Sequence, residues 1–235
     1  MKHSVNLEDV AMVARRLKSL ETHFVFTGGS VVTLLLDRPA VSISRPTKDV
    51  DVIAEVVTRI QYTKLEERLR GIGFRHDTSE GAPICRWVVD GVKVDVMPMH
   101  DPIGAFKNQW FDLAVSSAVP IQVHDETVRV ITAPCFVATK IEAFRDRGDD
   151  DFMASHDIED FLTVVDGRGS LGDEIRGASD ELRLFVALAV RGFLGDGRFI
   201  DSLPGHLPPD AASQQRLRLL RGRLDKIAAL PGART

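Results

Sequence analysis

The first residues whose types suit phosphate chemistry are Gly28, Gly29 and Ser30. They follow a short β-prone run, 24–26, and begin a segment, 30–37, that we expect to be helical. Glycines at a strand-to-helix turn let the backbone approach a ligand closely, and the start of a helix offers unpaired N–H groups to an anion. The Ser30 hydroxyl adds a donor for a phosphate oxygen. A tight turn with a helix cap is the alternative interpretation of this tripeptide.

Two aspartates flank a valine in the sequence Asp49-Val50-Asp51-Val52. If the valines point into a core, the alternation of a strand sends Asp49 and Asp51 together to the opposite face. Two carboxylates on one face repel each other unless a cation lies between them, and Mg²⁺ prefers such oxygen ligands. The spacing therefore predicts a divalent-cation site. The polar side of an edge strand is the alternative, and sugar-nucleotide glycosyltransferases and some phosphatases use the same spacing.

A third aspartate, Asp95, lies on the second arm of an expected β-hairpin. The apolar runs 84–89 and 92–97 flank Asp90-Gly91, a dipeptide that is typical of a tight hairpin turn. The valines of the second arm alternate with Asp95, so its carboxylate points to the face opposite to them. The order of these motifs, and not Asp95 alone, indicates function.

The expected elements form an α/β half followed by a helical half. We expect a mixed α/β (α+β) fold, with a small mixed sheet and flanking helices over residues 1–133 and a C-terminal helical domain over 134–235. The expected strands are 24–26, 50–53, 84–89, 92–97 and 127–131. The expected helices are 7–17, 30–37, 64–70, about 136–147, 155–165, 179–193 and 212–230, with a loop at 195–209.

The composition is that of an ordinary soluble globular protein, with 44% hydrophobic and 27% charged residues. A net charge of −4 argues against a wholesale electrostatic binder of nucleic acid, although it leaves room for a local basic patch. Cys85 and Cys135 are too few for a disulfide framework, and we expect both in the core. The longest apolar stretch, 31–36, is too short to cross a bilayer, so a cytoplasmic protein without membrane contact is expected.

Taken in order, the glycine-rich turn and the three aspartates resemble the nucleotidyltransferase superfamily of DNA polymerase β. The segment 45–52 looks especially like the AbiEii and MenT-type branch, the toxins of type IV toxin–antitoxin systems. The segment 140–147 has a lysine, a small residue and an arginine at the spacing of that branch, and 156–161 is similar to its Lys-Asp-X-X-Asp-Leu motif. His156 stands where the family usually has lysine. The resemblance covers about residues 20 to 165.

The resemblance implies a transfer of a nucleoside monophosphate from an NTP to an acceptor hydroxyl, with release of pyrophosphate. Asp49 and Asp51 would hold two Mg²⁺ ions, for which Mn²⁺ could substitute, and Asp95 would ligate the catalytic ion and take the proton of the acceptor. The residues implied in nucleotide binding are Gly28, Gly29, Ser30, Lys140, Arg147 and Asp157. Lys140 is also implied in catalysis, whereas Asp160 is expected to support its neighbours or cap a helix.

The toxin branch implies the 3′ end of tRNA as the acceptor and an antitoxin protein as a partner. A basic C-terminal segment is consistent with RNA binding, because the only acidic residue in 211–235 is Asp225. The basic residues there are Arg216, Arg218, Arg221, Arg223, Lys226 and Arg234. An amphipathic helix with solvated arginines is the alternative interpretation. Two other functions stay open, namely an enzyme with a small-molecule acceptor, as in aminoglycoside nucleotidyltransferases, and a catalytically silent binding protein of the same fold.

Overall fold

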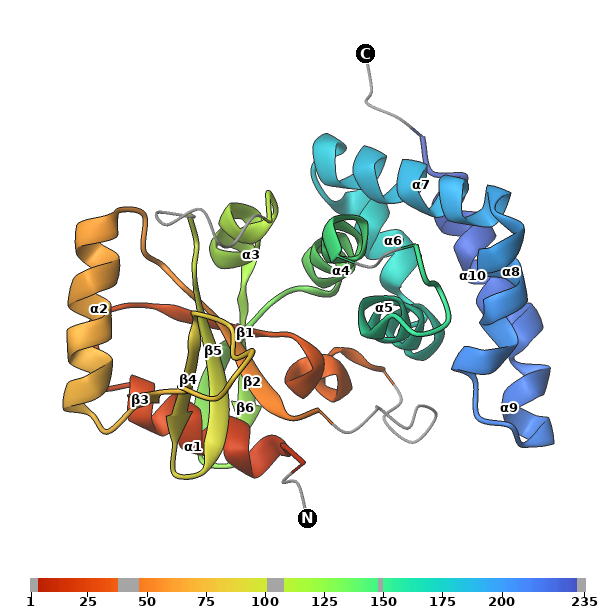
Figure 1. The fold of residues 1–235 in the computed structure, drawn as a ribbon. Helices are drawn as coiled ribbons and strands as arrows, with labels where there is room; N and C mark the ends of the chain where they lie inside the picture. Colours follow the sequence, from red (N-terminus) through yellow and green to blue (C-terminus); the bar gives the residue numbers. More distant parts are fainter. Residues whose placement is uncertain (1–3, 38–46, 101–107, 148–149, 232–235) are drawn as a thin grey trace. The chain divides into compact units, whose positions relative to one another are not determined.

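The computed structural model describes residues 4–37, 47–100, 108–147 and 150–231, and it divides the chain into two compact units (Figure 1). The sheet unit comprises Met1–Leu34 and Arg45–Thr132. The helical unit comprises Leu35–Ser44 and Ala133–Thr235.

A seven-stranded mixed sheet with the order β3-β4-β5-β2-β1-β7-β6 forms the sheet unit. β2 lies between β1, with which it pairs antiparallel, and β5, with which it pairs in parallel. The strands are β1 (Phe24–Thr27), β2 (Asp49–Ala54), β3 (Arg75–His76), β4 (Arg86–Val89), β5 (Val92–Pro98), β6 (Val119–Val123) and β7 (Glu126–Val130). The predicted mixed sheet with flanking helices is confirmed, and β3 and β6 are additions to it.

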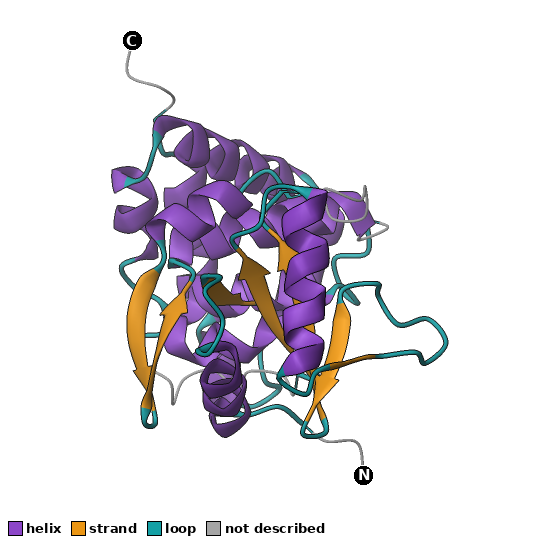
Figure 2. Cartoon of the chain, turned by 90° about the vertical axis from the view of Figure 1, so that its left-hand side faces the viewer, coloured by secondary structure: helices purple, strands orange, loops and turns teal. Residues whose placement is uncertain are grey.

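Helices flank this sheet, and their capping residues fix where they begin. In α1 (Leu7–Leu17) the Asn6 side chain accepts hydrogen bonds from the backbone N–H groups of the first turn. α2 (Arg59–Gly71) begins well before the predicted residue 64, because Thr58 and Gln61 form a capping box. Figure 2 shows α2 lying across one face of the sheet. The sheet unit also contains α3 (Phe111–Ser117) and the 3-10 helix η1 (Gly29–Leu35), which replaces the predicted helix 30–37.

The alternation predicted for β2 and β5 is present in the burial of their side chains. Val50 and Val52 of β2, and Val94 and Val96 of β5, are fully buried. This packing of β-branched side chains against the flanking helices leaves the other face of the two strands for polar residues.

The described residues of the helical unit form eight helical segments, and aromatic side chains lie in its core. The segments are α4 (Ala133–Arg147), α5 (His156–Gly167), α6 (Leu171–Gly177), α7 (Asp180–Gly195), α8 (Gly197–Ser202), η3 (Leu203–His206), α9 (Ala211–Gln215) and α10 (Leu217–Ala228). Phe193 of α7 has edge-to-face contacts with Phe144, Phe152 and Phe161. Such contacts add to the stabilisation that burial alone provides.

Two predictions for this unit are wrong. The expected loop 195–209 contains α8 and η3, because Asp196 caps α8 by accepting a hydrogen bond from the Arg198 backbone and Phe199 fixes the segment in the core. The expected continuous helix 212–230 is two helices that meet at Arg216.

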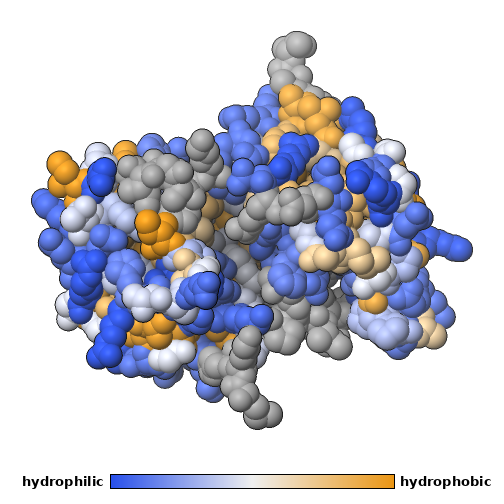
Figure 3. Space-filling view, viewed as in Figure 1, coloured by the Kyte–Doolittle hydropathy of each residue, from blue (hydrophilic) through white to orange (hydrophobic). Residues whose placement is uncertain are grey.

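The surface carries few large apolar side chains. Figure 3 shows mostly hydrophilic side chains on one face, with apolar ones in small separate areas. Among the described residues, no helix is both long enough and apolar enough to span a membrane. Both cysteines are free and buried, as expected.

Candidate functional site

Four adjacent strands place one polar residue each in a single row across the sheet. Asp51 of β2 pairs with Thr27 of β1 on one side and with Asp95 of β5 on the other. Asp95 in turn pairs with Arg86 of β4. Residues that are directly opposite in register project from the same face of a sheet, so these four side chains share one face. Asp49, two positions before Asp51, shares that face as well.

The three aspartates come from distant segments, and the sheet brings them together. The parallel pairing of β2 with β5 sets Asp51 beside Asp95 and Asp49 beside Lys93. Asp95 is only 8% exposed as a residue, whereas Asp49 and Asp51 are partly exposed. Like charges this close are costly without a compensating cation.

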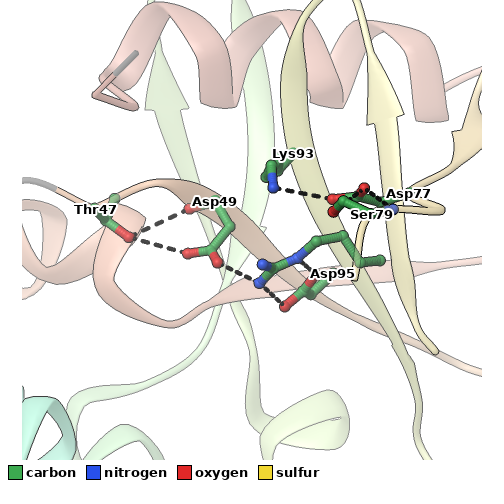
Figure 4. A network of polar contacts seen from close by, with 7 residues as sticks. Thr47, Asp49, Asp77, Ser79, Lys93 and Asp95 are labelled. Atoms are coloured by element: carbon green, nitrogen blue, oxygen red, sulfur yellow. Dashed lines mark hydrogen bonds and ion pairs between the residues drawn. The ribbon is translucent and has the colours of Figure 1, made fainter. Parts of the chain in front are cut away.

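Arg86 supplies that cation among the described residues. Its guanidinium donates from Nε to Asp95 Oδ1 and from Nη2 to Asp95 Oδ2, both at 2.7 Å, and Nη2 also lies 2.5 Å from Asp49 Oδ2. Figure 4 shows Asp49 and Asp95 in one network of polar contacts, which dashed lines mark. The other Asp49 oxygen, Oδ1, accepts a hydrogen bond of 3.2 Å from the Thr47 hydroxyl. Both carboxylates are therefore held in fixed orientations.

The electrostatics of this cluster follow from burial and from the shared guanidinium. Burial raises the pKa of the Asp95 carboxyl above its ordinary value; the hydrogen bonds and charge of Arg86 oppose this shift, and the charge of Asp49 adds to it. The pKa of Arg86 is raised, first by its hydrogen bond to Asp95, so the guanidinium stays charged. Nearby, Lys93 forms an ion pair of 3.0 Å with Asp77. Two of the three carboxylates, those of Asp49 and Asp95, thus share one guanidinium.

The glycine turn lies directly against Asp51. Gly28 has a φ of 69°, and a Cβ atom at this position would lie 1.8 Å from Asp51 Oδ2. Only glycine permits both this backbone conformation and this approach. η1 begins at Gly29, and the Ser30 hydroxyl donates to the Thr27 carbonyl oxygen at 3.3 Å. Ser30 therefore lies beside the aspartate row, and its hydroxyl is held by the end of β1.

The predicted residues of the helical unit form a second ionic cluster. Lys140 Nζ on α4 lies 3.0 Å from Asp157 Oδ1 and 2.6 Å from Asp160 Oδ2, both on α5. The three side chains are 11%, 10% and 3% exposed, respectively. Arg147 ends α4, and its side chain lies outside the described residues. Lys140 thus ties α4 to α5, and the roles predicted for Lys140, Arg147 and Asp157 toward a nucleotide stay predictions.

Arg86 is the residue that the motif-based prediction missed, although the sequence contains a signal for it. The two-residue turn Asp90-Gly91 fixes the hairpin register, which pairs Val89 with Val92 and hence Arg86 with Asp95. An arginine opposite a candidate catalytic aspartate could therefore have been read from the turn.

The donor set suits a hard divalent cation in its chemistry. Asp49, Asp51 and Asp95 offer carboxylate oxygens, which Mg²⁺ and Mn²⁺ prefer. Within the described ranges, no three His, Cys, Asp or Glu side chains are already gathered as a metal site, and Arg86 contacts two of the three aspartates. The residues therefore fit a cation once the guanidinium has moved from these oxygens.

Solved structures with similar folds were found. The chain matches the crystal structure of an antigenic nucleotidyltransferase-like protein from Paracoccidioides brasiliensis with a TM-score of 0.50 and 20% identity, over 79% of this chain and 87% of that one. The chain has a nucleotidyltransferase-like fold. It also matches the antibiotic-resistance factor ANT(2'')-Ia (TM-score 0.49, 15% identity, 80% and 93% covered) and JHP933 from Helicobacter pylori (TM-score 0.47, 12% identity, 94% and 88% covered).

A scan against protein-family models gave no match, and neither did a search of the curated proteins. At these identities the nucleotidyltransferase-like fold is what the comparisons establish, and activity has to be argued from the site itself.

Proposed function

We propose that this protein is a divalent-metal-dependent nucleotidyltransferase that moves a nucleoside monophosphate from an NTP to an acceptor hydroxyl. The observation that carries the proposal is the row of carboxylates next to the glycine turn. Asp49, Asp51 and Asp95 share one face of the sheet, and the Gly28 backbone lies against Asp51. A binding module would have no evident use for three adjacent acidic side chains, which cost stability when no cation is bound.

The chain's own residues would divide the work as follows. Asp49, Asp51 and Asp95 would hold two Mg²⁺ or Mn²⁺ ions, which when bound neutralise phosphate charge and favour ionisation of the acceptor hydroxyl. Gly28, Gly29 and Ser30 would hold the phosphates of the NTP through backbone N–H groups and the hydroxyl.

The reaction is a substitution at the α-phosphorus. A bond forms between the acceptor oxygen and the α-phosphorus, the bond to the β-phosphate oxygen breaks, and pyrophosphate leaves with that electron pair. Asp95 takes the proton of the acceptor hydroxyl.

For the acceptor we propose the 3′ end of tRNA, with the protein acting as the toxin of a toxin–antitoxin pair. The basic residues of α10 that would contact the RNA backbone are fewer than the sequence suggests. Arg216 binds Asp166, and Arg223 donates to the Val165 and Asp166 carbonyl oxygens at the end of α5. Arg218 and Lys226 are exposed, and Arg221 pairs with Asp225 at 3.4 Å. The RNA contact therefore rests mainly on these three residues.

The experiment that tests the proposed function is incubation of the full chain with each α-labelled NTP and Mg²⁺. Total tRNA, a protein lysate and a panel of aminoglycosides are offered as separate acceptors. We expect label in tRNA and none with an Asp51→Asn variant. Label in a small molecule would replace the tRNA proposal, and absence of label from every acceptor, with folded protein and Mg²⁺ or Mn²⁺ present, would contradict transferase activity.

A further inference from the structure

The guanidinium of Arg86 lies where a cation is needed by the aspartate row. It contacts Asp95 through two nitrogens and Asp49 through one of them. The Arg86 side chain is 17% exposed, so the contacts are shielded from water in large part. A planar fork with several donors can hold two carboxylates at once, which the single ammonium of a lysine does less well.

Arg86 and a divalent cation compete for the same carboxylates, because two positive charges this close repel each other. Asp95 offers Oδ1 and Oδ2, and both already accept hydrogen bonds from Arg86. Of the Asp49 oxygens, Oδ2 is bound to Arg86 and Oδ1 to Thr47. A metal ion that binds Asp49 Oδ2 or either oxygen of Asp95 therefore competes with the guanidinium for them.

We propose that Arg86 is a built-in counter-cation, a positioning residue that holds Asp49 and Asp95 when metal is absent and that a divalent ion displaces. This inference rests on the proposed function, because it takes the aspartate row to be a metal site. Arg86 lowers the repulsion among the carboxylates, so the sheet unit folds with the site already aligned. The consequence is weaker metal binding, because only the fraction of molecules in which Arg86 has released the oxygens can bind the ion.

The inference is tested by Mn²⁺ binding to the full chain, followed by electron paramagnetic resonance of the free ion. The variants are Arg86→Gln and, as a control with the same loss of charge, Arg15→Gln, whose side chain pairs with Glu126 elsewhere in the sheet unit. If the Arg86-bound state is populated to about 90% or more, removing it tightens Mn²⁺ binding about tenfold or more. We expect no such tightening in Arg15→Gln.

Each outcome separates this inference from the proposed function. Equal or weaker Mn²⁺ binding by Arg86→Gln, with the wild type binding Mn²⁺, overturns the inference and leaves the proposed function standing. Absence of Mn²⁺ binding in both proteins overturns both.

A measurement on the wild type covers the case in which Arg86→Gln does not fold. The Nε–H resonance of Arg86, assigned by its loss in Arg86→Lys, is followed in a proton–nitrogen spectrum during a Mg²⁺ titration. We expect this N–H to be protected from exchange without Mg²⁺ and to lose protection as the site fills. Protection that persists at saturating Mg²⁺ overturns the inference.

Discussion

The sheet unit and the helical unit each contain a cluster of two aspartates around one cation, and the two clusters differ in what they leave accessible. Arg86 joins Asp49 to Asp95, and Lys140 joins Asp157 to Asp160. In the helical unit all three side chains are at most 11% exposed. In the sheet unit Asp49 is 23% exposed, and Asp51 lies in register with Asp95.

This difference shows how the same ion-pair chemistry serves two purposes. The helical cluster neutralises buried charges and ties α4 to α5, since a buried charge that lacks a partner is strongly destabilising. The sheet cluster has a third carboxylate, that of Asp51, in register beside Asp95, and Asp49 and Asp51 are partly exposed. We therefore expect the helical cluster to govern stability and the sheet cluster to govern activity.

The largest expected difference between substitutions in the two clusters is in the rate of nucleotide transfer. Asp49→Asn and Asp51→Asn should each lower the transfer rate about 1000-fold or more, because several kcal/mol of charge stabilisation are removed from the transition state. Asp51→Asn should melt at or above the wild-type temperature, since a repelling charge is gone, whereas Asp49→Asn also loses its ion pair with Arg86. The matched variant Asp157→Asn should keep more activity and lose stability. An Asp157→Asn protein of wild-type stability without activity would show that the helical cluster belongs to the catalytic machinery.

The second-largest effect is on stability, and it concerns the helical cluster. Lys140→Met leaves Asp157 and Asp160 buried without their lysine, and it should lower the free energy of unfolding by about 3–5 kcal/mol. Urea unfolding measures this loss, which Mg²⁺ should not restore. Any destabilisation of Arg86→Gln should, by contrast, be restored in part by Mg²⁺. If Mg²⁺ restores the stability of Lys140→Met to the same extent, the two clusters do not differ in the way proposed.

The next effect concerns the glycine that touches the sheet cluster. Gly28→Ala places a methyl group into the Asp51 carboxylate at a φ of 69°, so it should cost about 2 kcal/mol or more and impair transfer. Gly81→Ala is the control, because Gly81 has a similar φ of 76° with nothing within 4 Å of the added methyl group. It should cost about 1–2 kcal/mol, from its backbone conformation alone, and leave transfer unchanged. If the two variants lose the same stability and activity, the close approach of Gly28 to Asp51 has no effect on either.

The smallest effect uses one cysteine in each unit as a reporter. Burial, followed by the charges of Asp95 and Asp51, raises the pKa of the Cys85 thiol to about 12. In a Cys135→Ser protein, Cys85 should therefore react with a disulfide reagent at pH 8 about 1000-fold more slowly than in the unfolded chain. Saturating Mg²⁺ should speed this reaction slightly by offsetting the aspartate charges. In a Cys85→Ser protein, Mg²⁺ should leave the reaction of Cys135 unchanged; equal responses of the two thiols would contradict the comparison.

The strands that carry the candidate site could be predicted because their side chains alternate. Val50 and Val52 pointed into the core as expected, and Asp90-Gly91 formed the turn between β4 and β5. The pairing of Asp51 with Asp95 could not be predicted, because it depends on which distant strands become neighbours. Arg86 was missed for a different reason. A motif contains residues that are close in sequence, whereas Arg86 meets Asp95 across the hairpin of β4 and β5.

The helical unit was harder to predict from sequence. The spacing of Asp157 and Asp160 indicated one face of α5, but their contact with Lys140 depends on how α4 packs against α5. Short segments such as α8 and η3 carry little periodic signal, and glycines and prolines in 195–209 suggested a loop. Burial of Phe199 and Leu203 overrides that local preference.

The parallel pairing of β2 with β5 has a consequence for how the chain folds. Parallel neighbours need a long crossover, here formed by α2, β3 and β4, and the Arg86–Asp49 contact alone spans 37 positions of sequence. The entropy of closing this crossover must be overcome before any contact across it is gained. On the ribosome, Asp49, Asp51 and then Arg86 emerge before Asp95, because β2 and β4 precede β5 in the chain. The three aspartates therefore come together only when β5 has emerged and paired with β2.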